Sequence, residues 1–236
     1  MKVQSARSAA SVSRSHSLPY AGPFVAFLIL LGLSRWLPLP PVAMQAGFAG
    51  AMLAVLAILA RPALSAPSAL RLRNWPGSLL AGVFVFALWI APDLLIPGYR
   101  HHPWFENSML GTAQAGLSAA SQGNTAILWL RAFRAVAIVP LVEELFWRAW
   151  LMRWLISADF ESVPLGAWSA RAFWLVAILF ASEHGSYWDV GLAAGLIYNW
   201  WMLRTRSLAD LVLAHAVTNA CLSLYIVWAG KWEYWS

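Results

Sequence analysis

Three stretches of this sequence set polar side chains capable of acid–base chemistry among apolar residues. They are 141-LVEELFWRAW-150, 180-FASEHG-185 and 215-HAVTN-219. A buried carboxylate can take a proton from water, and an imidazole can hold the water and relay that proton. A second imidazole and an amide can donate hydrogen bonds to the oxyanion of a tetrahedral intermediate. If the three stretches meet in space, their combined chemistry is that of hydrolysis.

The first stretch contains two adjacent acids and one base. Glu144 and Arg148 are four residues apart, so they share one face of a helix and can pair, acid before base. Glu143 points about 100° away around the helix. The pair has two open interpretations, a buried ion pair that fixes helix packing and a part of a site. Glu143 is not matched by the single arginine, which favours a functional role for it.

The other two stretches each bring an imidazole. His184 lies one turn after Phe180 near the end of an apolar run, where a lone histidine is often a helix cap. His215 and Asn219 are four apart inside an apolar run, so both point the same way. Without a catalytic role they would join helices by hydrogen bonds, each worth about 0.6 kcal/mol in a membrane bundle.

The whole composition indicates a membrane protein. Of 236 residues, 61% are hydrophobic and 11% are charged, whereas soluble domains carry about 25% charged residues. The formal net charge is +6, but the basic residues lie mostly between apolar runs, where they set orientation in the membrane. Nucleic-acid binding is therefore not expected. Cys221 is the only cysteine, so no disulfide within the chain is expected.

The apolar runs predict an all-α, polytopic bundle of about seven or eight transmembrane helices. The runs are at about 20–38, 42–60, 77–97, 124–157, 172–187, 188–203 and 207–230. The run 124–157 would be roughly 50 Å long as one helix, against a hydrocarbon core of about 30 Å. Pro140 lies inside it, which predicts a kink or two consecutive helices. Arg131 and Arg134 also lie inside it, and they point either to the site or to lipid headgroups.

The domain organisation is simple. Residues 1–18 are rich in serine and carry basic residues, which is typical of a disordered cytoplasmic tail. Residues 19–236 then form a single membrane domain. Basic residues concentrate in the connections that would be cytoplasmic if the N-terminus is inside. This predicts an integral membrane protein with a cytoplasmic N-terminus, in contact with the lipid bilayer.

The three motifs together resemble a known family. In order, EE-xxx-R, F-xxx-H and H-xxx-N resemble the CAAX-processing and bacteriocin-processing membrane proteases, also called the CPBP or abortive-infection family. The resemblance covers about residues 125–230, which would form the catalytic core. It implies a glutamate-type intramembrane endopeptidase with about eight spans. The flanking sequence is similar to the bacterial branch associated with exosortase-type protein-sorting systems, which implies a location in a bacterial inner membrane.

The resemblance also implies roles for matching residues. Glu143 would activate water with the help of His184. His215 and Asn219 would stabilise the oxyanion. The substrate would be a membrane-associated protein or peptide, and a prenyl group on it is not required of bacterial members.

The remaining matched residues, Glu144, Arg148 and Phe180, would order the site. The family mechanism implies no cofactor. From the residue types alone, zinc bound by Glu143, His184 and His215 is the less favoured alternative, since a carboxylate and two imidazoles form a hydrolytic zinc set.

Two other classes of function stay open on the sequence. One is a catalytically silent membrane scaffold of the same fold. The other is a proton-coupled carrier, because buried carboxylates and histidines also build proton relays. Against the carrier, the sequence shows no pair of interrupted helices in corresponding halves.

Overall fold

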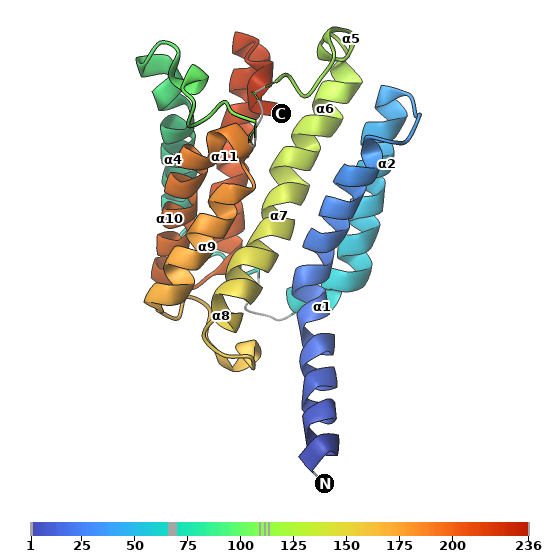
Figure 1. Cartoon of the computed structure of the whole chain (residues 1–236), viewed down its shortest axis with the longest axis vertical. Helices are drawn as coiled ribbons and strands as arrows, with labels where there is room; N and C mark the ends of the chain where they lie inside the picture. Colours follow the sequence, from blue (N-terminus) through green and yellow to red (C-terminus); the bar gives the residue numbers. More distant parts are fainter. Residues whose placement is uncertain (1, 66–69, 109, 111, 113, 236) are drawn as a thin grey trace.

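The computed structural model describes residues 2–65, 70–108, 110, 112 and 114–235, with side chains from His16 onward. The expected basic tail, residues 1–18, lies almost entirely outside the described side chains. The described backbone is helical and has no β-strand, with most helices side by side along one axis (Figure 1). This confirms the predicted all-α polytopic class.

Seven helices or continuous helical stretches of the described residues make up the bundle. They are α1 (Lys2–Ser34), α2–η1–α3 (Pro41–Val55, Leu56–Ala60, Arg61–Leu64), α4 (Trp75–Leu95), α6–η3–α7–η4–α8 (Thr125–Phe133, Arg134–Ile138, Val139–Glu144, Leu145–Leu151, Met152–Trp154), α9 (Ala170–Ser182), α10 (Trp188–Thr205) and α11 (Leu208–Ala229). Short helices lie in the connections: η2 (Tyr99–His101), α5 (Ala119–Gln122), η5 (Phe160–Ser162), η6 (Gly185–Tyr187) and η7 (Trp232–Trp235).

Five of these stretches are long and apolar enough to cross a membrane. They are His16–Ser34, Pro41–Leu64, Trp75–Leu95, Thr125–Trp154 and Leu208–Ala229. Helix α9 is apolar but has only 13 residues, a length of about 20 Å. Helix α10 carries Asp189 and Arg204 near its two ends. The five spans agree with the predicted multi-span protein. Helices α9 and α10 correspond to two further predicted spans, but they are not among the helices that are long and apolar enough to cross a membrane.

The long helix 125–154 stays continuous through Pro140, so the alternative of two consecutive helices is wrong. The segment just before the proline, η3, is π-helical. A π turn holds one extra residue, and this extra residue accommodates a ring that would otherwise clash with the carbonyl four residues earlier. A second π segment, η4, follows the two glutamates and contains Arg148. The site residues of this helix therefore lie between and within two π segments.

Polar caps define where the helices near the site begin. At the start of α4, α6, α9 and α11, a side-chain oxygen accepts a hydrogen bond from a backbone N–H of the first turn. The capping residues are Asn74, Asn124, Ser169 and Ser207. Such caps satisfy amide groups that have no partner within the helix.

A buried carboxylate fixes α11 against α4. Asp210 is fully buried and accepts hydrogen bonds from the backbone N–H of Arg73 at 2.7 Å and of Asn74 at 2.9 Å. The hydroxyl of Ser78 donates to the same carboxylate at 3.1 Å. These contacts join the first turns of the two helices, and so set the register in which α11 presents His215.

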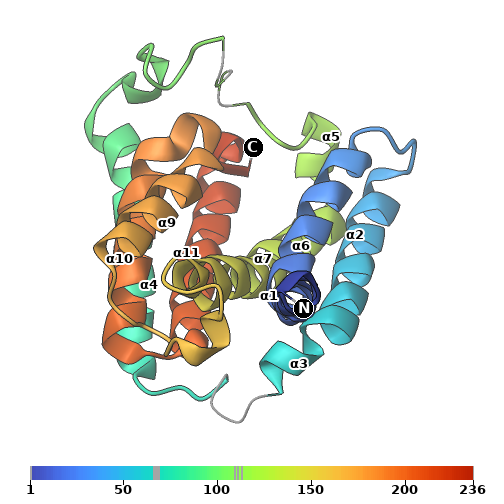
Figure 2. The same ribbon diagram turned by 60° about the horizontal axis from the view of Figure 1, so that its bottom comes forward.

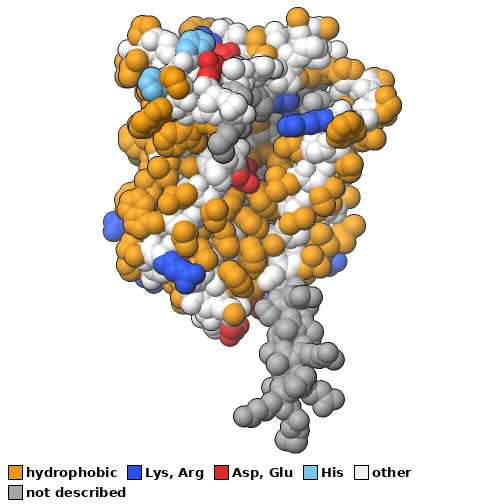
Figure 3. All heavy atoms as spheres, in the orientation of Figure 1, with side chains coloured by type: hydrophobic (Ala, Val, Ile, Leu, Met, Phe, Trp, Pro, Cys, Tyr) orange, Lys and Arg blue, Asp and Glu red, His pale blue; other side chains and the backbone are white. Residues whose placement is uncertain are grey.

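The helices form two groups on either side of the long helix 125–154 (Figures 1 and 2). Helices α1 and α2 pack together on one side, and α4, α9, α10 and α11 pack on the other. Large apolar side chains cover much of the outer surface in Figure 3, as a lipid-facing surface requires. Examples from different helices are Ile29, Ile58, Leu80, Ile178 and Leu224, all exposed.

Candidate active site

Glu144 and Arg148 form a fully buried ion pair on the long helix. The Nη1 of Arg148 donates to both carboxylate oxygens of Glu144 at 3.1 Å, and neither side chain is exposed. The i,i+4 spacing predicted this contact, and the π segment that begins at Leu145 preserves it. The pair satisfies the charge of Glu144 within the protein.

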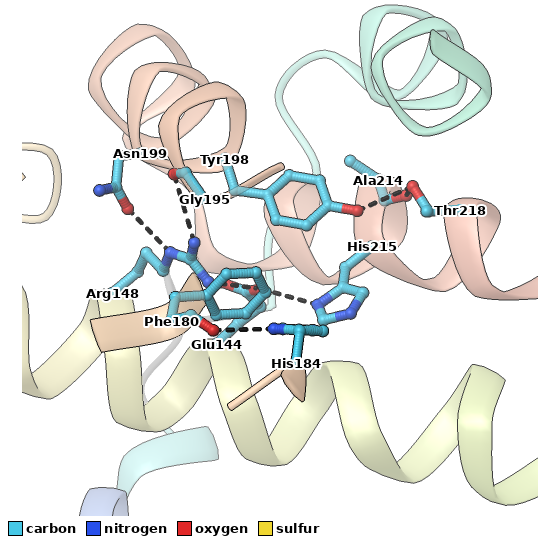
Figure 4. Close-up of polar contacts among 10 residues, drawn as sticks. All are labelled: Glu144, Arg148, Phe180, His184, Gly195, Tyr198, Asn199, Ala214, His215 and Thr218. Atoms are coloured by element: carbon cyan, nitrogen blue, oxygen red, sulfur yellow. Dashed lines mark hydrogen bonds and ion pairs between the residues drawn. The ribbon is translucent and has the colours of Figure 1, made fainter. Parts of the chain in front are cut away.

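The guanidinium of Arg148 also ties the long helix to α10. Its Nε donates to the side-chain oxygen of Asn199 at 2.9 Å, and its Nη2 donates to the carbonyl of Gly195 at 3.4 Å. Asn199 in turn donates to the carbonyl of Phe173 on α9 at 2.8 Å. One arginine therefore fixes three helices relative to one another (Figure 4).

Two aromatic rings enclose this arginine. The guanidinium carbon lies 4.4 Å from the ring centre of Phe180 and 5.5 Å from that of Tyr198. Desolvated contacts of this kind favour the cation. Phe180 also lies against the ring of His184, with centres 4.7 Å apart. It thus touches both a charged and a titratable member of the cluster.

His215 belongs to the same buried network. Its Nδ1 donates to Oε1 of Glu144 at 2.8 Å, and its ring stacks on Tyr198 at 5.0 Å. The hydroxyl of Tyr198 donates to Thr218 at 2.7 Å, and Thr218 donates to the carbonyl of Gly82 on α4 at 2.9 Å. The imidazole is thereby held by α7, α10 and α11 together.

Glu143 differs from its neighbour in having no matched charge. Its Oε2 is buried and has no hydrogen-bond partner among the described residues. Two carboxylates, Glu144 and Glu183, and the guanidinium of Arg148 are the charges that act on it. Since the guanidinium is bound to Glu144, Glu143 is the carboxylate of this helix that remains able to bind something else.

His184 lies just beyond the end of α9. Its Nδ1 donates to the carbonyl of Phe180 at 2.8 Å, which caps the helix. This bond fixes the neutral tautomer in which Nε2 is an acceptor. The ring lies 5.1 Å from Trp89, and a side chain at Gly191 would come within 3.1 Å of it. The capping interpretation is correct, and it coexists with an Nε2 that can accept a hydrogen bond.

Asn219 is oriented by the π segment before Pro140. Its amide donates to the carbonyl of Ala135 at 2.8 Å. A side-chain amide has two hydrogens, so one N–H remains for a ligand. The contact links α11 to η3, in the part of the long helix that precedes the two glutamates.

Several members of this network were not foreseen from the sequence. They are Trp89, Gly195, Tyr198, Asn199 and Thr218. Asn199 had a usable signal, because it is a buried amide on an apolar helix four residues after Gly195. Trp89 had no such signal, because the sequence contains sixteen tryptophans. The contact of Trp89 with His184 depends on how α4 packs.

The described residues were also considered as metal ligands. Among them, no group of three His, Cys, Asp or Glu side chains is arranged to hold a metal ion. Glu143, His184 and His215, the set of the zinc alternative, therefore do not form such a group in this arrangement.

Comparison with known proteins identifies the core of the chain. Residues 125–221 match the model of a family described as "Rce1-like: Type II CAAX prenyl endopeptidase Rce1-like". The match starts at the first turn of α6 and ends two residues after Asn219, so it includes all the site residues from Glu143 to Asn219. Neither the curated proteins nor the solved structures include one that matches this chain.

Proposed function

We propose a mechanism and a substrate class for this protein. Through residues 125–221 the chain belongs to the Rce1-like family of CAAX endopeptidases, and it is a membrane-embedded protease. The observation that carries the proposal is the contrast between two adjacent acids. Glu144 is paired with Arg148 and His215, while the buried oxygen of Glu143 has no partner among the described residues. An unpaired buried carboxylate beside a satisfied one has the properties of a general base.

In the proposed first step, Glu143 and His184 activate a water molecule. The water donates one hydrogen to the Glu143 carboxylate and the other to Nε2 of His184. Glu143 takes the proton as the oxygen attacks the carbonyl carbon of the scissile peptide bond. The peptide C–N bond then breaks, and the protonated Glu143 returns its proton to the leaving amine.

The oxyanion of the tetrahedral intermediate accepts hydrogen bonds from His215 and Asn219. With its Nδ1 bonded to Glu144, His215 donates from its Nε2–H to the oxyanion. The second N–H of Asn219 donates beside it. Donors held in place before the reaction are the largest single contribution in many hydrolases.

In this mechanism Glu144, Arg148 and Phe180 position the reacting groups. Glu144 holds His215, Arg148 holds Glu144, and Phe180 packs on both Arg148 and His184. No cofactor takes part, so a metal chelator should leave cleavage unchanged. The substrate is a membrane-associated protein or peptide. Whether it carries a lipid group is left to the experiment.

The test compares Glu143→Gln and His184→Ala with the unchanged protein at equal membrane levels in the host cell. Mass spectrometry would read the C-termini and new N-termini of membrane and secreted proteins. A processed end that disappears in both variants would establish proteolysis and name the substrate. Glu161→Gln is the matched control, because the same change is made at a carboxylate that is 43% exposed and remote from the site. Unchanged ends in both site variants would instead support the silent scaffold.

A further inference from the structure

Glu183 is a carboxylate that the proposed mechanism does not use. It is the C-cap residue of α9 and directly precedes His184. It is exposed, and no described basic residue forms an ion pair with it. The C-terminal end of a helix carries a partial negative charge, so a carboxylate there is unfavourable for the helix. Helix stability therefore does not account for Glu183.

The charges around Glu183 do not compensate for it. Glu143 on the long helix lies near enough for the two carboxylates to repel each other. The guanidinium of Arg148 attracts both of them, but its hydrogen bonds go to Glu144 and to α10. Two carboxylates thus lie near each other while the neighbouring cation is bound elsewhere.

The indole of Trp147 adds an unused donor at the same place. Trp147 follows Glu143 by four residues, is 5% exposed, and packs edge-on against Phe180 with ring centres 6.2 Å apart. Its N–H interacts with the carboxylate of Glu183. The contact does not reach hydrogen-bond geometry, and the buried nitrogen has no partner among the described residues. A buried N–H without a partner costs free energy, so the unused donor and the unpaired acid together indicate a ligand.

The position of Glu183 indicates the class of that ligand. The next residue, His184, is proposed to hold the attacking water together with Glu143, so a group bound by Glu183 lies beside the peptide bond that is cut. A metal ion is not favoured, because no three His, Cys, Asp or Glu side chains of the described residues are arranged to hold one. A lysine or arginine of the substrate offers a cation to Glu183 and a backbone carbonyl to the N–H of Trp147.

We propose that Glu183 selects substrates with a basic residue beside the scissile bond. This inference rests on the proposed function and adds a specificity residue to it. The carboxylate of Glu183 binds the ammonium or guanidinium group of that substrate residue, and the indole N–H of Trp147 donates to its carbonyl oxygen. The bound cation also reduces the repulsion between Glu183 and Glu143. An arrangement that is unfavourable in the free protein is thereby completed by the substrate, as is common at functional sites.

The test measures binding and needs no cleavage. The protein carrying Glu143→Gln, in phosphatidylcholine nanodiscs, is titrated with short peptides of alanine and leucine whose two ends are blocked. A single lysine is moved along the peptide, and norleucine at the same position supplies a similar stem without the charge. At one position lysine should bind about tenfold or more tightly than norleucine, the usual value of a hydrogen bond to a charged group.

Variants of Glu183 assign this preference to its carboxylate. Glu183→Gln should remove the preference for lysine, and Glu183→Lys should replace it by a preference for glutamate at the same position. Glu161→Gln is the matched control, since the same change is made at a remote carboxylate that is 43% exposed, and it should keep the preference for lysine. Equal binding of lysine and norleucine at every position would overturn the proposal, as would a lysine preference that persists in Glu183→Gln.

Folding is followed in the same preparation. The Tm of Glu183→Gln should be unchanged or higher, because the variant removes a negative charge from the end of α9. If the Tm falls, Glu183→Lys decides, because misfolding cannot reverse a preference. A Glu183→Lys protein without a preference for glutamate would then assign Glu183 a structural role and overturn the proposal.

A lipid amine is the other source of a cation. Nanodiscs containing phosphatidylethanolamine are analysed by native mass spectrometry. A bound lipid that is lost in Glu183→Gln, with equal binding of lysine and norleucine peptides, would assign the carboxylate to a lipid headgroup and overturn the proposal. Because these assays use a variant that does not cleave, their result is independent of the processed ends that test proteolysis.

Discussion

One carboxylate, Glu144, is the residue on which the geometry of the site depends. It accepts from Arg148 and from His215 at the same time, and none of its surface is exposed. Removing one partner of a buried ion pair leaves the other charge without compensation. The planar guanidinium also reaches Asn199 and Gly195 with its other nitrogens, which a lysine ammonium cannot do.

Arg148→Lys should therefore lower both stability and activity. We expect a loss of roughly 2–3 kcal/mol in the free energy of unfolding, measured by denaturant unfolding in detergent micelles. Arg204→Lys is the control, since Arg204 is exposed on α10 and should lose nothing. A fully stable Arg148→Lys protein would mean that the hydrogen bonds of the guanidinium nitrogens are not what holds the three helices together.

Asn219 has a different proposed role, the stabilisation of the oxyanion, and kinetic measurements can distinguish this role from substrate binding. Asn219→Ala should lower kcat about 100-fold with little change in KM, because an oxyanion donor acts mainly in the transition state. Ser223→Ala removes a buried hydroxyl on the same helix that has no hydrogen-bond partner among the described residues, and should leave kcat unchanged. A loss confined to KM would place Asn219 in substrate binding instead.

At the scale of elements, close helix packing is what brings α11 to the long helix. Gly82 of α4 has Val217 beside it, and a Cβ there would come within 2.7 Å of the Cβ of Val217 and closer still to the carbonyl of Ala214. The carbonyl of Gly82 also accepts from Thr218. The two helices can approach this closely only because residue 82 has no side chain.

Gly82→Ala should consequently push α4 away from α11. We expect a loss of about 1–3 kcal/mol from overpacking, together with lower activity, because His215 lies beside Ala214. Gly50→Ala is the matched control on α2, where a Cβ would meet nothing within 4 Å. That control should keep activity and gain up to about 1 kcal/mol from helix propensity. Equal behaviour of the two variants would contradict this account.

The sequence predicted these elements unevenly, for physical reasons. Spacings of three and four residues within a helix predicted that Glu144 meets Arg148 and that His215 and Asn219 share a face. These spacings could not predict the hydrogen bond between His215 and Glu144. The two residues are 71 positions apart in the sequence, and their contact depends on how two helices pack. The π segments were also beyond a pattern analysis that assumes 3.6 residues per turn, and the continuity of helix 125–154 through Pro140 follows from one of them.

At the scale of the whole molecule, composition alone predicted the class, because a chain with 11% charged residues has too few to cover a soluble surface. The number of crossings was harder to predict. Helix α9 has 13 residues and α10 has charged residues near both ends, so neither resembles an independent span. Packed against neighbours, both still run along the bundle, and the two ends of the chain lie at opposite ends of it (Figure 1).

Seven passes predict that the termini are on opposite sides of the membrane. The basic residues of the connections predict that the N-terminus is in the cytoplasm. A fluorescent reporter that folds only in the cytoplasm should be active at the N-terminus and silent at the C-terminus. An enzyme reporter active only outside should give the reverse. The same reporters in the connection 98–118 serve as an internal control, expected outside. Reporters that place both termini on one side would show that α9 and α10 do not each cross.

The π segment at residues 134–138 has one more consequence, for how related chains are compared. Deleting a single residue there would restore α-helical spacing and turn everything after it by about 100° relative to everything before it. The motif EE-xxx-R would survive letter for letter, and a sequence alignment would record one gap. The glutamates, however, would lie at a different angle around the helix axis relative to Phe133 and the residues before it. Chains that align across such a gap have the same motif residues, but these residues are arranged differently in space.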